Sequence, residues 1–394
     1  MTNMKKLALQ YFIEQNRNWE ELLSQKPYSL HISRDTIFGR NLVMFKYDML
    51  NSDMNIGLCR EARGIILDED TLEVVSMAFY KFFNVQEGHA DTIDWNNCWT
   101  SSKIDGSICK IVRLGDNFLM STNGTIDAFK AQLQDQIGCP FNSFGDLIID
   151  AVIRGYNKIH NDTISDKQSA FDWLKTILDD GYTYIFELTS KWNHIVVKFD
   201  KPELHFLGVR DNTKLQEIPF FEHNLKNIFH TPELYPLNNL EDCLKATEAM
   251  GNDQEGFVVC DKLFHRVKIK SPCYCALHHM RQDDGSLSLN SAIEVIKRGT
   301  VDDILAQWPE FKPTIDELIS KFEHAVDNVQ KSWDKFNSIL DTLPTRKDQA
   351  IWIKDNSEFP GIMFALLDKK IDNPHDAVYS LPNKTIIKMF GYKE

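Results

Sequence analysis

A short segment, Lys103–Ser107 (KIDGS), places a potential nucleophile at the start of a tight turn. Asp-Gly favours a turn with positive φ, where the backbone can approach a ligand closely. A lysine held there could attack an electrophile if neighbouring cations or burial lowered its pKa. Taken alone, the pattern is better explained by a surface hairpin with a solvated lysine, because Asp-Gly turns are common. The other charged segments of the chain therefore decide the interpretation.

Four further segments place carboxylates or cations in or beside strand-like runs. They are Arg60–Gly64 (REARG), Phe186–Leu188 (FEL), Glu255–Val259 (EGFVV) and Val267–Lys270 (VKIK). In the last of these, Lys268 and Lys270 stand two positions apart, so both face the same side of a strand. Each segment alone is most often a strand whose charged residue faces water.

Together, the five segments supply the parts for nucleophilic attack on a phosphate. Lys103 is the nucleophile, and Glu187 and Glu255 can hold Mg²⁺, often through its waters. Three cations can neutralise charge on the α-phosphate and on the leaving pyrophosphate. These cations are Arg63, Lys268 and Lys270.

In this order, the segments resemble the covalent nucleotidyltransferase superfamily of polynucleotide ligases and mRNA capping enzymes. The match is K-x-D-G, F-E, E-G-x-V and V-K-I-K. Within it, the chain resembles the phage-type RNA ligase 1 family from about residue 42 to residue 280, and more weakly to about residue 310. Further runs that carry the resemblance are Met44–Tyr47, Arg63–Ile65, Lys81–Asn84, Asn193–Val196 and Lys268–Ser271 with Tyr274.

The resemblance implies an ATP-dependent RNA ligase that works in three steps. The lysine takes AMP from ATP, AMP passes to a 5′-phosphate RNA end, and a 3′-hydroxyl attacks that end and expels AMP. The implied cofactors are ATP and Mg²⁺. The implied partner is RNA with 5′-phosphate and 3′-hydroxyl ends, such as broken tRNA, which places the enzyme in RNA repair.

Carried over to this chain, the resemblance makes Lys103 the nucleophile and Glu255 a metal ligand. Asp302 and Asp303, which follow Gly299-Thr300, resemble a metal-binding aspartate pair of the family. Two adjacent aspartates are equally typical of the acidic first turn of a helix, where they bind no metal. The residues implied for the ATP site are Tyr47, Arg63, Lys81, Glu187, Lys268 and Lys270.

One position departs from the family pattern. The family often carries a basic residue just before the glycine of a K-G-S-type run. Here the run is Ser121–Thr125 (STNGT), so Asn123 stands at that position. A phosphate contact is therefore either missing or supplied elsewhere, and Asn123 receives no role.

The first two-thirds of the chain indicate an α+β fold with antiparallel sheets and flanking helices, rather than a doubly wound sheet. Short β-rich runs bounded by turn residues predict strands, two of which form a hairpin across Gly115–Asn117. The predicted strands are Ser107–Leu114, Phe118–Ser121, Tyr182–Thr189, His194–Phe199, Leu204–Val209, Gly256–Cys260 and Arg266–Lys270. The predicted helices are Thr125–Gln136 and Ala170–Leu178.

After about residue 278 the periodicity becomes helical. Apolar residues recur at steps of three and four over Ile315–Leu340, and Thr314 with Glu317 forms a potential capping box. Shorter helical patterns cover Ala292–Ile296 and Asp302–Trp308. We therefore expect an adenylyltransferase domain over residues 1–278 and an all-helical domain over 279–394 that selects the RNA substrate. DNA ligases and capping enzymes usually carry a small β-barrel domain at this place. The helical periodicity of this chain therefore favours the RNA ligase 1 resemblance.

Composition limits the class of protein. The length of 394 residues favours two domains. The net charge of −13 argues against non-specific nucleic-acid binding, but not against an enzyme with a basic cleft. No apolar run reaches the roughly 18 residues that span a bilayer, and the eight cysteines form no disulfide framework. We expect a monomer with free thiols in the cytoplasm, that of the host if the gene comes from a phage, and no membrane contact.

Other interpretations remain open at this stage. The chain could be a DNA ligase or a capping guanylyltransferase of the same superfamily, or a non-catalytic RNA-binding module. The complete Lys/Glu/Glu/Lys/Lys set argues against lost chemistry. A zinc site is a less favoured interpretation of Cys273, Cys275, His278 and His279, because their spacing is close and a second knuckle is absent.

Overall fold

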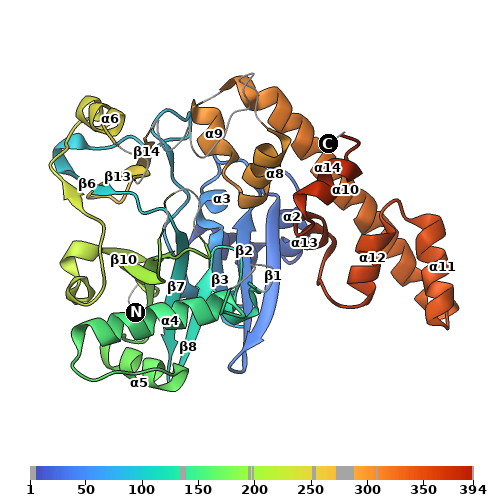
Figure 1. Cartoon of the computed structure of the whole chain (residues 1–394), viewed down its shortest axis with the longest axis horizontal. Coiled ribbons are helices and arrows are strands. Elements are labelled where there is room, and N and C mark those ends of the chain that lie inside the picture. Colours follow the sequence, from blue (N-terminus) through green and yellow to red (C-terminus); the bar gives the residue numbers. More distant parts are fainter. Residues whose placement is uncertain are drawn as a thin grey trace. The chain divides into compact units, whose positions relative to one another are not determined.

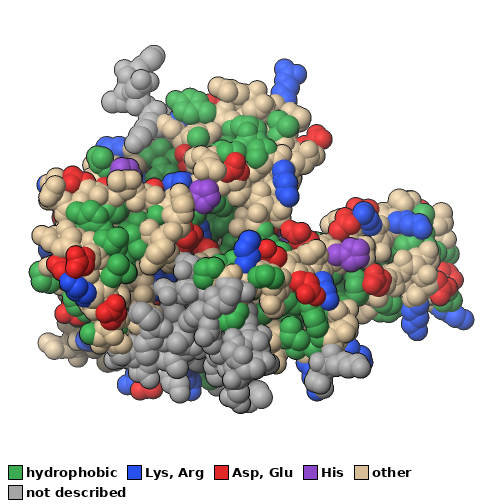
Figure 2. Space-filling view, turned by 90° about the horizontal axis from the view of Figure 1, so that it is seen from above, with side chains coloured by type: hydrophobic (Ala, Val, Ile, Leu, Met, Phe, Trp, Pro, Cys, Tyr) green, Lys and Arg blue, Asp and Glu red, His purple; other side chains and the backbone are tan. Residues whose placement is uncertain are grey.

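The computed structural model describes residues 6–133, 139–193, 197, 199–250, 254–271, 288–307 and 309–392. Its internal packing divides the chain into two compact units, Met1–His278 and His279–Glu394, and each is described by itself (Figure 1). Charged side chains of both signs are interspersed on the face drawn in Figure 2. Within the described ranges, no helix combines the length and the apolar character that a membrane crossing requires.

Three sheets make up the first unit. The first sheet has the order β1 (Leu30–Ile37), β2 (Arg40–Tyr47), β3 (Arg63–Asp68), β4 (Val74–Ser76). The second has the order β11 (Gln216–Pro219), β10 (Glu203–Asp211), β9 (Tyr182–Thr189), β7 (Ser107–Leu114), β8 (Asn117–Thr122). The third has the order β12 (Leu234–Tyr235), β6 (Cys98–Ser102), β13 (Gly256–Asp261), β14 (Arg266–Lys270), β5 (Phe83–Asn84). All named pairs are antiparallel except β5 with β14.

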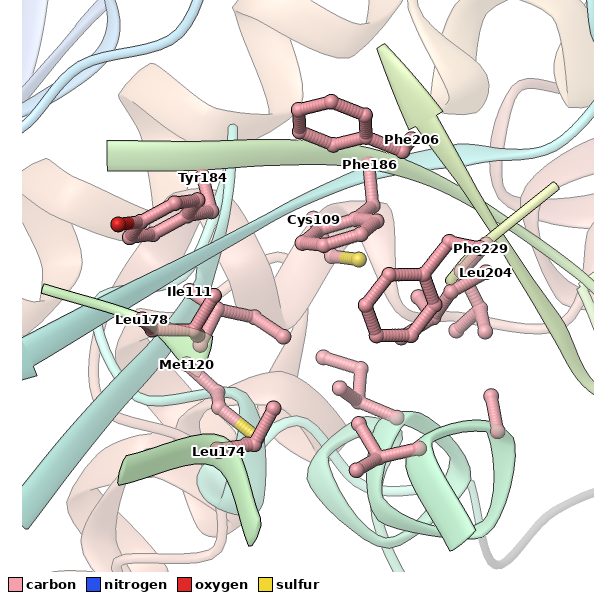
Figure 3. Close-up of a cluster of buried hydrophobic side chains, with 14 of the residues drawn as sticks. Cys109, Ile111, Met120, Leu174, Leu178, Tyr184, Phe186, Leu204, Phe206 and Phe229 are labelled. Atoms are coloured by element: carbon pink, nitrogen blue, oxygen red, sulfur yellow. The ribbon is translucent and has the colours of Figure 1, made fainter. Parts of the chain in front are cut away.

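The largest core of this unit lies between the second sheet and two helices, α4 (Phe144–Ile159) and α5 (Lys167–Ile177). Figure 3 shows side chains of β7, β9 and β10 gathered in it, among them Cys109, Phe186 and Phe206. Ser143 and Asp146 close a capping box at the start of α4. Each large apolar side chain buried here stabilises the unit by about 1.5–3 kcal/mol.

Short helices complete the first unit. They are α1 (Ala8–Gln15), α2 (Trp19–Ser24), α3 (Gly57–Glu61) and α6 (Leu240–Glu248), with 3₁₀ turns at Trp95–Asn97, Ala128–Lys130, Phe220–Glu222 and Asn224–Asn227. The buried carboxylate of Glu61 accepts from the backbone N–H groups of Ala8 and Leu9 at 3.0 and 2.8 Å. It thereby fixes α1 beside the start of the first sheet, since these N–H groups have no partner within the helix.

The second unit is helical throughout its described part. Its helices are α8 (Leu289–Arg298), α9 (Val301–Gln307), α10 (Lys312–Ser338), α11 (Arg346–Asn356), α12 (Pro360–Leu367), α13 (Pro374–Tyr379) and α14 (Asn383–Met389), with 3₁₀ turns at Pro309–Phe311 and Leu340–Thr342. One face of α10 is buried against α8 and α13 at the spacing expected of an amphipathic helix. The buried residues of that face are Ile315, Leu318, Ile319, Phe322, Ala325, Val329 and Phe336.

The α+β class, the antiparallel sheets and the helical second unit confirm the predicted fold. Two predictions are wrong. The described part of Thr125–Gln136 contains bends, the 3₁₀ turn and an isolated bridge at Gln132 but no α-helix, because packing of Ile126 and Ala128 into two cores overrides the helical pattern. Thr314 makes no capping box, since α10 starts at Lys312 and Thr314 lies inside its first turn.

Some predictions fall on residues outside the description. The predicted strand His194–Phe199 is described only at Val197 and Phe199, and neither is in a strand. Tyr274 and the residues considered for zinc, Cys273, Cys275, His278 and His279, all lie outside the described residues. The helix α4, which the sequence patterns did not single out, covers the second sheet.

Candidate active site

Lys103 lies in the segment that crosses from the third sheet to the second. β6 ends at Ser102 and β7 begins at Ser107, so residues 103–106 span the gap between the two sheets. The backbone N–H of Lys103 donates to the carbonyl of Gly256 at 2.8 Å. The candidate nucleophile is therefore tied to β13 on one side and leads directly into β7 on the other.

The Lys103 ammonium shares one buried carboxylate with a second lysine. Its Nζ lies 2.6 Å from Oε2 of Glu255, while Nζ of Lys270 lies 3.0 Å from Oε1 of the same side chain. The side chain of Glu255 is 3% exposed and that of Lys103 is 22% exposed. Glu255 thus holds two cations in the interior, and one of them stays within reach of a ligand.

A glycine allows Glu255 to come this close to Lys270. Gly256 has φ of +142°, and a Cβ there would lie 2.1 Å from the carbonyl oxygen of Ile269 on β14. Only glycine can occupy such a position, so the E-G pair of the motif has a direct structural reason. The register that results pairs Gly256 with Lys270.

The Asp-Gly turn brings Lys103 to the second sheet. A Cβ at Gly106 would lie 2.4 Å from the carbonyl oxygen of Leu188 and 3.0 Å from Cγ of Glu187, so the turn packs directly on β9. Asp105 is buried and accepts from the N–H of Val197 at 2.7 Å. The turn is therefore a partly buried junction between two sheets rather than a surface hairpin.

Glu187 is the contribution of β9 to this cluster. Burial raises the pKa of Glu187 to about 8; Lys103 and Arg63 oppose this rise, whereas the Glu255 and Asp105 carboxylates reinforce it. These Coulombic partners show that Glu187 lies among the charges of the motif residues. Two buried carboxylates that repel each other, surrounded by lysine and arginine, are typical of a functional site.

The first sheet and the segment that follows it supply an aromatic face and two more cations. Nζ of Lys81 lies 5.1 Å from the ring centroid of Tyr47, which ends β2. Arg63, which begins β3, donates to the carbonyl of Tyr80 at 3.3 Å and lies 4.9 Å from the ring centroid of Phe82. Cations over rings are attracted by the negative π face, which keeps these side chains ordered at the edge of the cluster.

Lys268 and Lys270 lie on β14 as the alternation predicts, and both are buried. The neighbouring strand β5 pairs Asn84 with Lys268, and the carbonyl of Lys268 accepts from the N–H of Val85 at 3.0 Å. Since β5 begins two residues after Lys81, this pairing connects the segment of Lys81 to the strand that carries Lys268 and Lys270.

Asp302 and Asp303 belong to the other unit of the chain. They lie in the second unit, in the first turn of α9, where acidic residues favour a helix. Within the described residues, no group of three or more His, Cys, Asp or Glu side chains could hold a metal ion. Glu187 and Glu255 are the carboxylates of this cluster that could bind a metal ion together with water or substrate oxygens.

Sequence patterns missed a buried lysine on β7. Lys110 is completely buried in β7, donates to the carbonyl of Gly64, and has its pKa lowered to about 7 by burial and by Arg63. A lysine in the middle of an apolar strand, as in SICKIVRL, is the signal that could have found it.

Comparison with known proteins connects this arrangement to one family. A family model described as RNA ligase matches residues 61–274. A relative from Autographa californica nuclear polyhedrosis virus, named a bifunctional polynucleotide kinase/RNA ligase, is 27% identical over 331 residues. The match covers 77% of this chain and 44% of that protein, so the chain spans less than half the length of this relative.

Solved structures with a similar arrangement include two ligases. An archaeal ATP-dependent RNA ligase has a TM-score of 0.43 and 13% identity, with 73% of this chain and 68% of that chain covered. A variant of Naegleria gruberi RNA ligase with ATP and Mn has a TM-score of 0.32 and 15% identity, with 45% of this chain and 50% of that chain covered.

Proposed function

Since this chain belongs to the phage-type RNA ligase family, we propose that it joins RNA ends with ATP, through AMP bound covalently to Lys103. The observation that carries the proposal is the position of the Lys103 amine. It is partly exposed, 2.6 Å from the buried carboxylate of Glu255, and beside the carboxylate of Glu187. A nucleophile next to a carboxylate that can take its proton is the arrangement that covalent catalysis requires.

In the first step, the Lys103 nitrogen bonds to the α-phosphorus of ATP, and the bond from that phosphorus to the bridging oxygen breaks. Pyrophosphate leaves, and Glu255 is placed to accept the proton that the amine loses. Lys268 and Lys270 concentrate positive charge on the sheet that Lys103 follows in the chain, where negative charge would develop on the α-phosphate. Tyr47, Lys81 and Arg63 are proposed to hold the rest of the nucleotide.

The two glutamates fit a divalent cation. Glu187 and Glu255 are buried carboxylates that repel each other, as the raised pKa of Glu187 indicates, and a cation between or beside them would relieve this repulsion. Mg²⁺ commonly uses one or two carboxylates and completes its shell with water and substrate phosphates. When bound, it would neutralise charge on the reacting phosphate.

We extend the proposal to the later steps and to the substrate. AMP passes from Lys103 to a 5′-phosphate RNA end, and a 3′-hydroxyl then displaces it. Broken tRNA is the proposed natural substrate, and the helical unit from His279 to Glu394 is proposed to select it. We also propose a monomer in a reducing cytoplasm, which the free thiols of the six described cysteines support.

Labelling followed by sealing tests this proposal. Incubation with radiolabelled ATP should label the chain, whereas GTP should not, and the label should move to RNA with a 5′-phosphate. Sealing is then compared on broken tRNA, linear single-stranded RNA and nicked duplex DNA. Label from GTP alone would indicate a guanylyltransferase, sealing of nicked DNA alone would indicate a DNA ligase, and no label would indicate a non-catalytic module.

A further inference from the structure

Lys46 is an exposed cation at the end of β2, and it points at a turn of another sheet. Its Nζ lies 3.7 Å from the position that a Cβ on Gly124 would occupy. It makes no ion pair with any residue in the described part of the chain. A lysine that approaches a backbone turn without a carboxylate partner is free to bind an anion there.

The strand register places Lys46 directly opposite a second cation. β2 and β3 pair Lys46 with Arg63, just after a bulge at Phe45, and the N–H of Tyr47 donates to the carbonyl of Ala62 at 2.6 Å. Directly opposed residues of an antiparallel pair lie on the same face, and like charges there repel each other. The fold therefore keeps two cations together at the edge of the ATP site proposed above.

Gly64, which follows Arg63, packs against the turn that contains Asn123 and Gly124. Its φ is +75°, and a Cβ on it would lie 2.5 Å from Cα of Asn123. Behind it, the buried amine of Lys110 donates to the Gly64 carbonyl. The turn itself is held by the Thr122 hydroxyl, which accepts from the N–H groups of Gly124 and Thr125 at 3.1 Å each. Lys46 thus approaches a fixed backbone turn that packs against Gly64, the residue that follows Arg63 and accepts from Lys110.

The turn also contains an unsatisfied polar atom. Oδ1 of Asn123 is buried and has no hydrogen-bond partner among the described residues. Asn123 carries no charge, so the positive charge at this place comes from Lys46, across the turn, rather than from the turn itself. An anion bound against Gly124 would meet the Lys46 amine on one side and the backbone turn on the other.

We propose that Lys46 binds the outer phosphates of ATP and stabilises the leaving pyrophosphate, a role that rests on the ligase function proposed above. In-line displacement requires the leaving group to point away from the attacking nitrogen. Lys268 and Lys270 lie on the third sheet, whose strand β6 ends one residue before Lys103, whereas Lys46 and Arg63 lie on the first sheet. The first-sheet cations therefore suit the departing end of the triphosphate.

The test compares Lys46→Ala with the wild-type chain in reactions that do and do not involve pyrophosphate. The first is AMP attachment to Lys103 at varied ATP, and the second is removal of that AMP by added pyrophosphate. The half-saturating concentrations of ATP in the first reaction and of pyrophosphate in the second should each rise about ten- to a hundredfold. This is the effect of losing one charge-assisted hydrogen bond. Sealing of RNA that already carries 5′-AMP needs no pyrophosphate and serves as the internal reference.

A charge-relocation variant separates a binding role from a folding role. Lys46→Ala/Asn123→Lys returns a cation to the turn from its other side and should restore most of the affinity for ATP and pyrophosphate. Lys245→Ala is the matched control, because Lys245 is 65% exposed on α6 and pairs with Glu241 in the preceding turn. Melting curves of all variants establish that the fold is retained.

Three outcomes would overturn the inference. Unchanged ATP and pyrophosphate dependence in Lys46→Ala would remove Lys46 from the nucleotide site while leaving the ligase function intact. A weaker interaction with RNA ends alone would assign Lys46 to the RNA instead. Failure of the wild-type chain to accept AMP from ATP would contradict the ligase function itself, and with it this role.

Discussion

Lys103 and Glu255 are 152 residues apart in the sequence, yet Nζ of the lysine lies 2.6 Å from Oε2 of the glutamate. The pair connects the turn after β6 to the start of β13, on neighbouring strands of the third sheet. Because Lys270 binds the other carboxylate oxygen, Glu255 would keep one cationic partner if the Lys103 amine turned to a phosphate. A buried carboxylate that keeps a partner avoids the cost of an unpaired buried charge.

The first prediction concerns Lys103. Lys103→Ala should abolish AMP attachment without unfolding the chain, because Glu255 keeps its contact with Lys270. Lys103→Arg is the matched control, since it preserves the positive charge but stays protonated and cannot attack. Both variants should lack the covalent label on a denaturing gel and melt within a few degrees of the wild-type chain. A labelled alanine variant would show that the nucleophile is another residue.

The second prediction concerns Glu255, which is 3% exposed. Glu255→Gln should slow AMP attachment about a hundredfold, the scale of losing one preorganised charge at a reaction centre. It should also lower the free energy of unfolding by about 3 kcal/mol, because Lys103 and Lys270 lose their shared carboxylate. Added Mg²⁺ should rescue the rate only in part. A variant with normal rate and normal Mg²⁺ dependence would refute the assignment.

The third prediction is a pH dependence at Glu187. Its folded pKa of about 8 lies above its ordinary value of 4.5, so burial favours the protonated form. The stability that this group contributes is therefore fully present below about pH 4.5 and is lost as the pH rises towards about pH 8. Glu187→Gln cannot ionise and escapes this loss. Without ATP and metal, its melting temperature should rise relative to the wild-type value across this window.

The matched control for that experiment is Glu241→Gln, because the Glu241 side chain is 77% exposed. Its melting difference from the wild-type chain should stay flat with pH. A flat difference for Glu187→Gln as well would contradict the burial of an ionisable carboxyl at this position. With Mg²⁺ and ATP present, Glu187→Gln should instead be slower in AMP attachment at every pH, since it cannot bind the cation as a carboxylate.

The fourth prediction separates the two units. Truncation after His278 should leave ATP-dependent labelling of Lys103, because the cluster from Tyr47 to Lys270 lies in the first unit. Sealing of structured RNA should fall more than sealing of simple single strands, if the helical unit selects the substrate. Circular dichroism must first show that the truncated chain is folded. A folded truncation that accepts no AMP, or that seals every RNA normally, would contradict this division of labour.

The fifth prediction decides the role of Asp302 and Asp303. If the pair binds metal, as the family resemblance implies, Asp302→Asn/Asp303→Asn should raise the Mg²⁺ concentration for half-maximal sealing about tenfold, one lost charge-assisted contact. The alternative follows from their position in the first turn of α9. In that case the variant should keep its Mg²⁺ dependence, and the free energy of unfolding of the helical unit should fall by about 0.3–1 kcal/mol. This result would leave the two aspartates only a helix-stabilising role.

Local sequence patterns determined much of the secondary structure. β7, β9 and β14 begin and end at the residues predicted for them, because β-rich runs between turn residues report strands directly. The buried face of α10 follows the same logic with a period of three to four. Where neighbouring apolar residues pack into separate cores, as Ile126 and Ala128 do, the local pattern predicts a helix that is absent from the structure.

The sequence by itself also determined which residue types stand in the motif order, and hence the family. Only the tertiary structure decided which of them meet. The shared carboxylate of Glu255, the buried amine of Lys110 and the approach of Lys46 to Gly124 all join strands far apart in the chain. Such contacts depend on strand register and on close backbone approach at Gly64, Gly106 and Gly256, which are set by packing across three sheets rather than by neighbours in sequence.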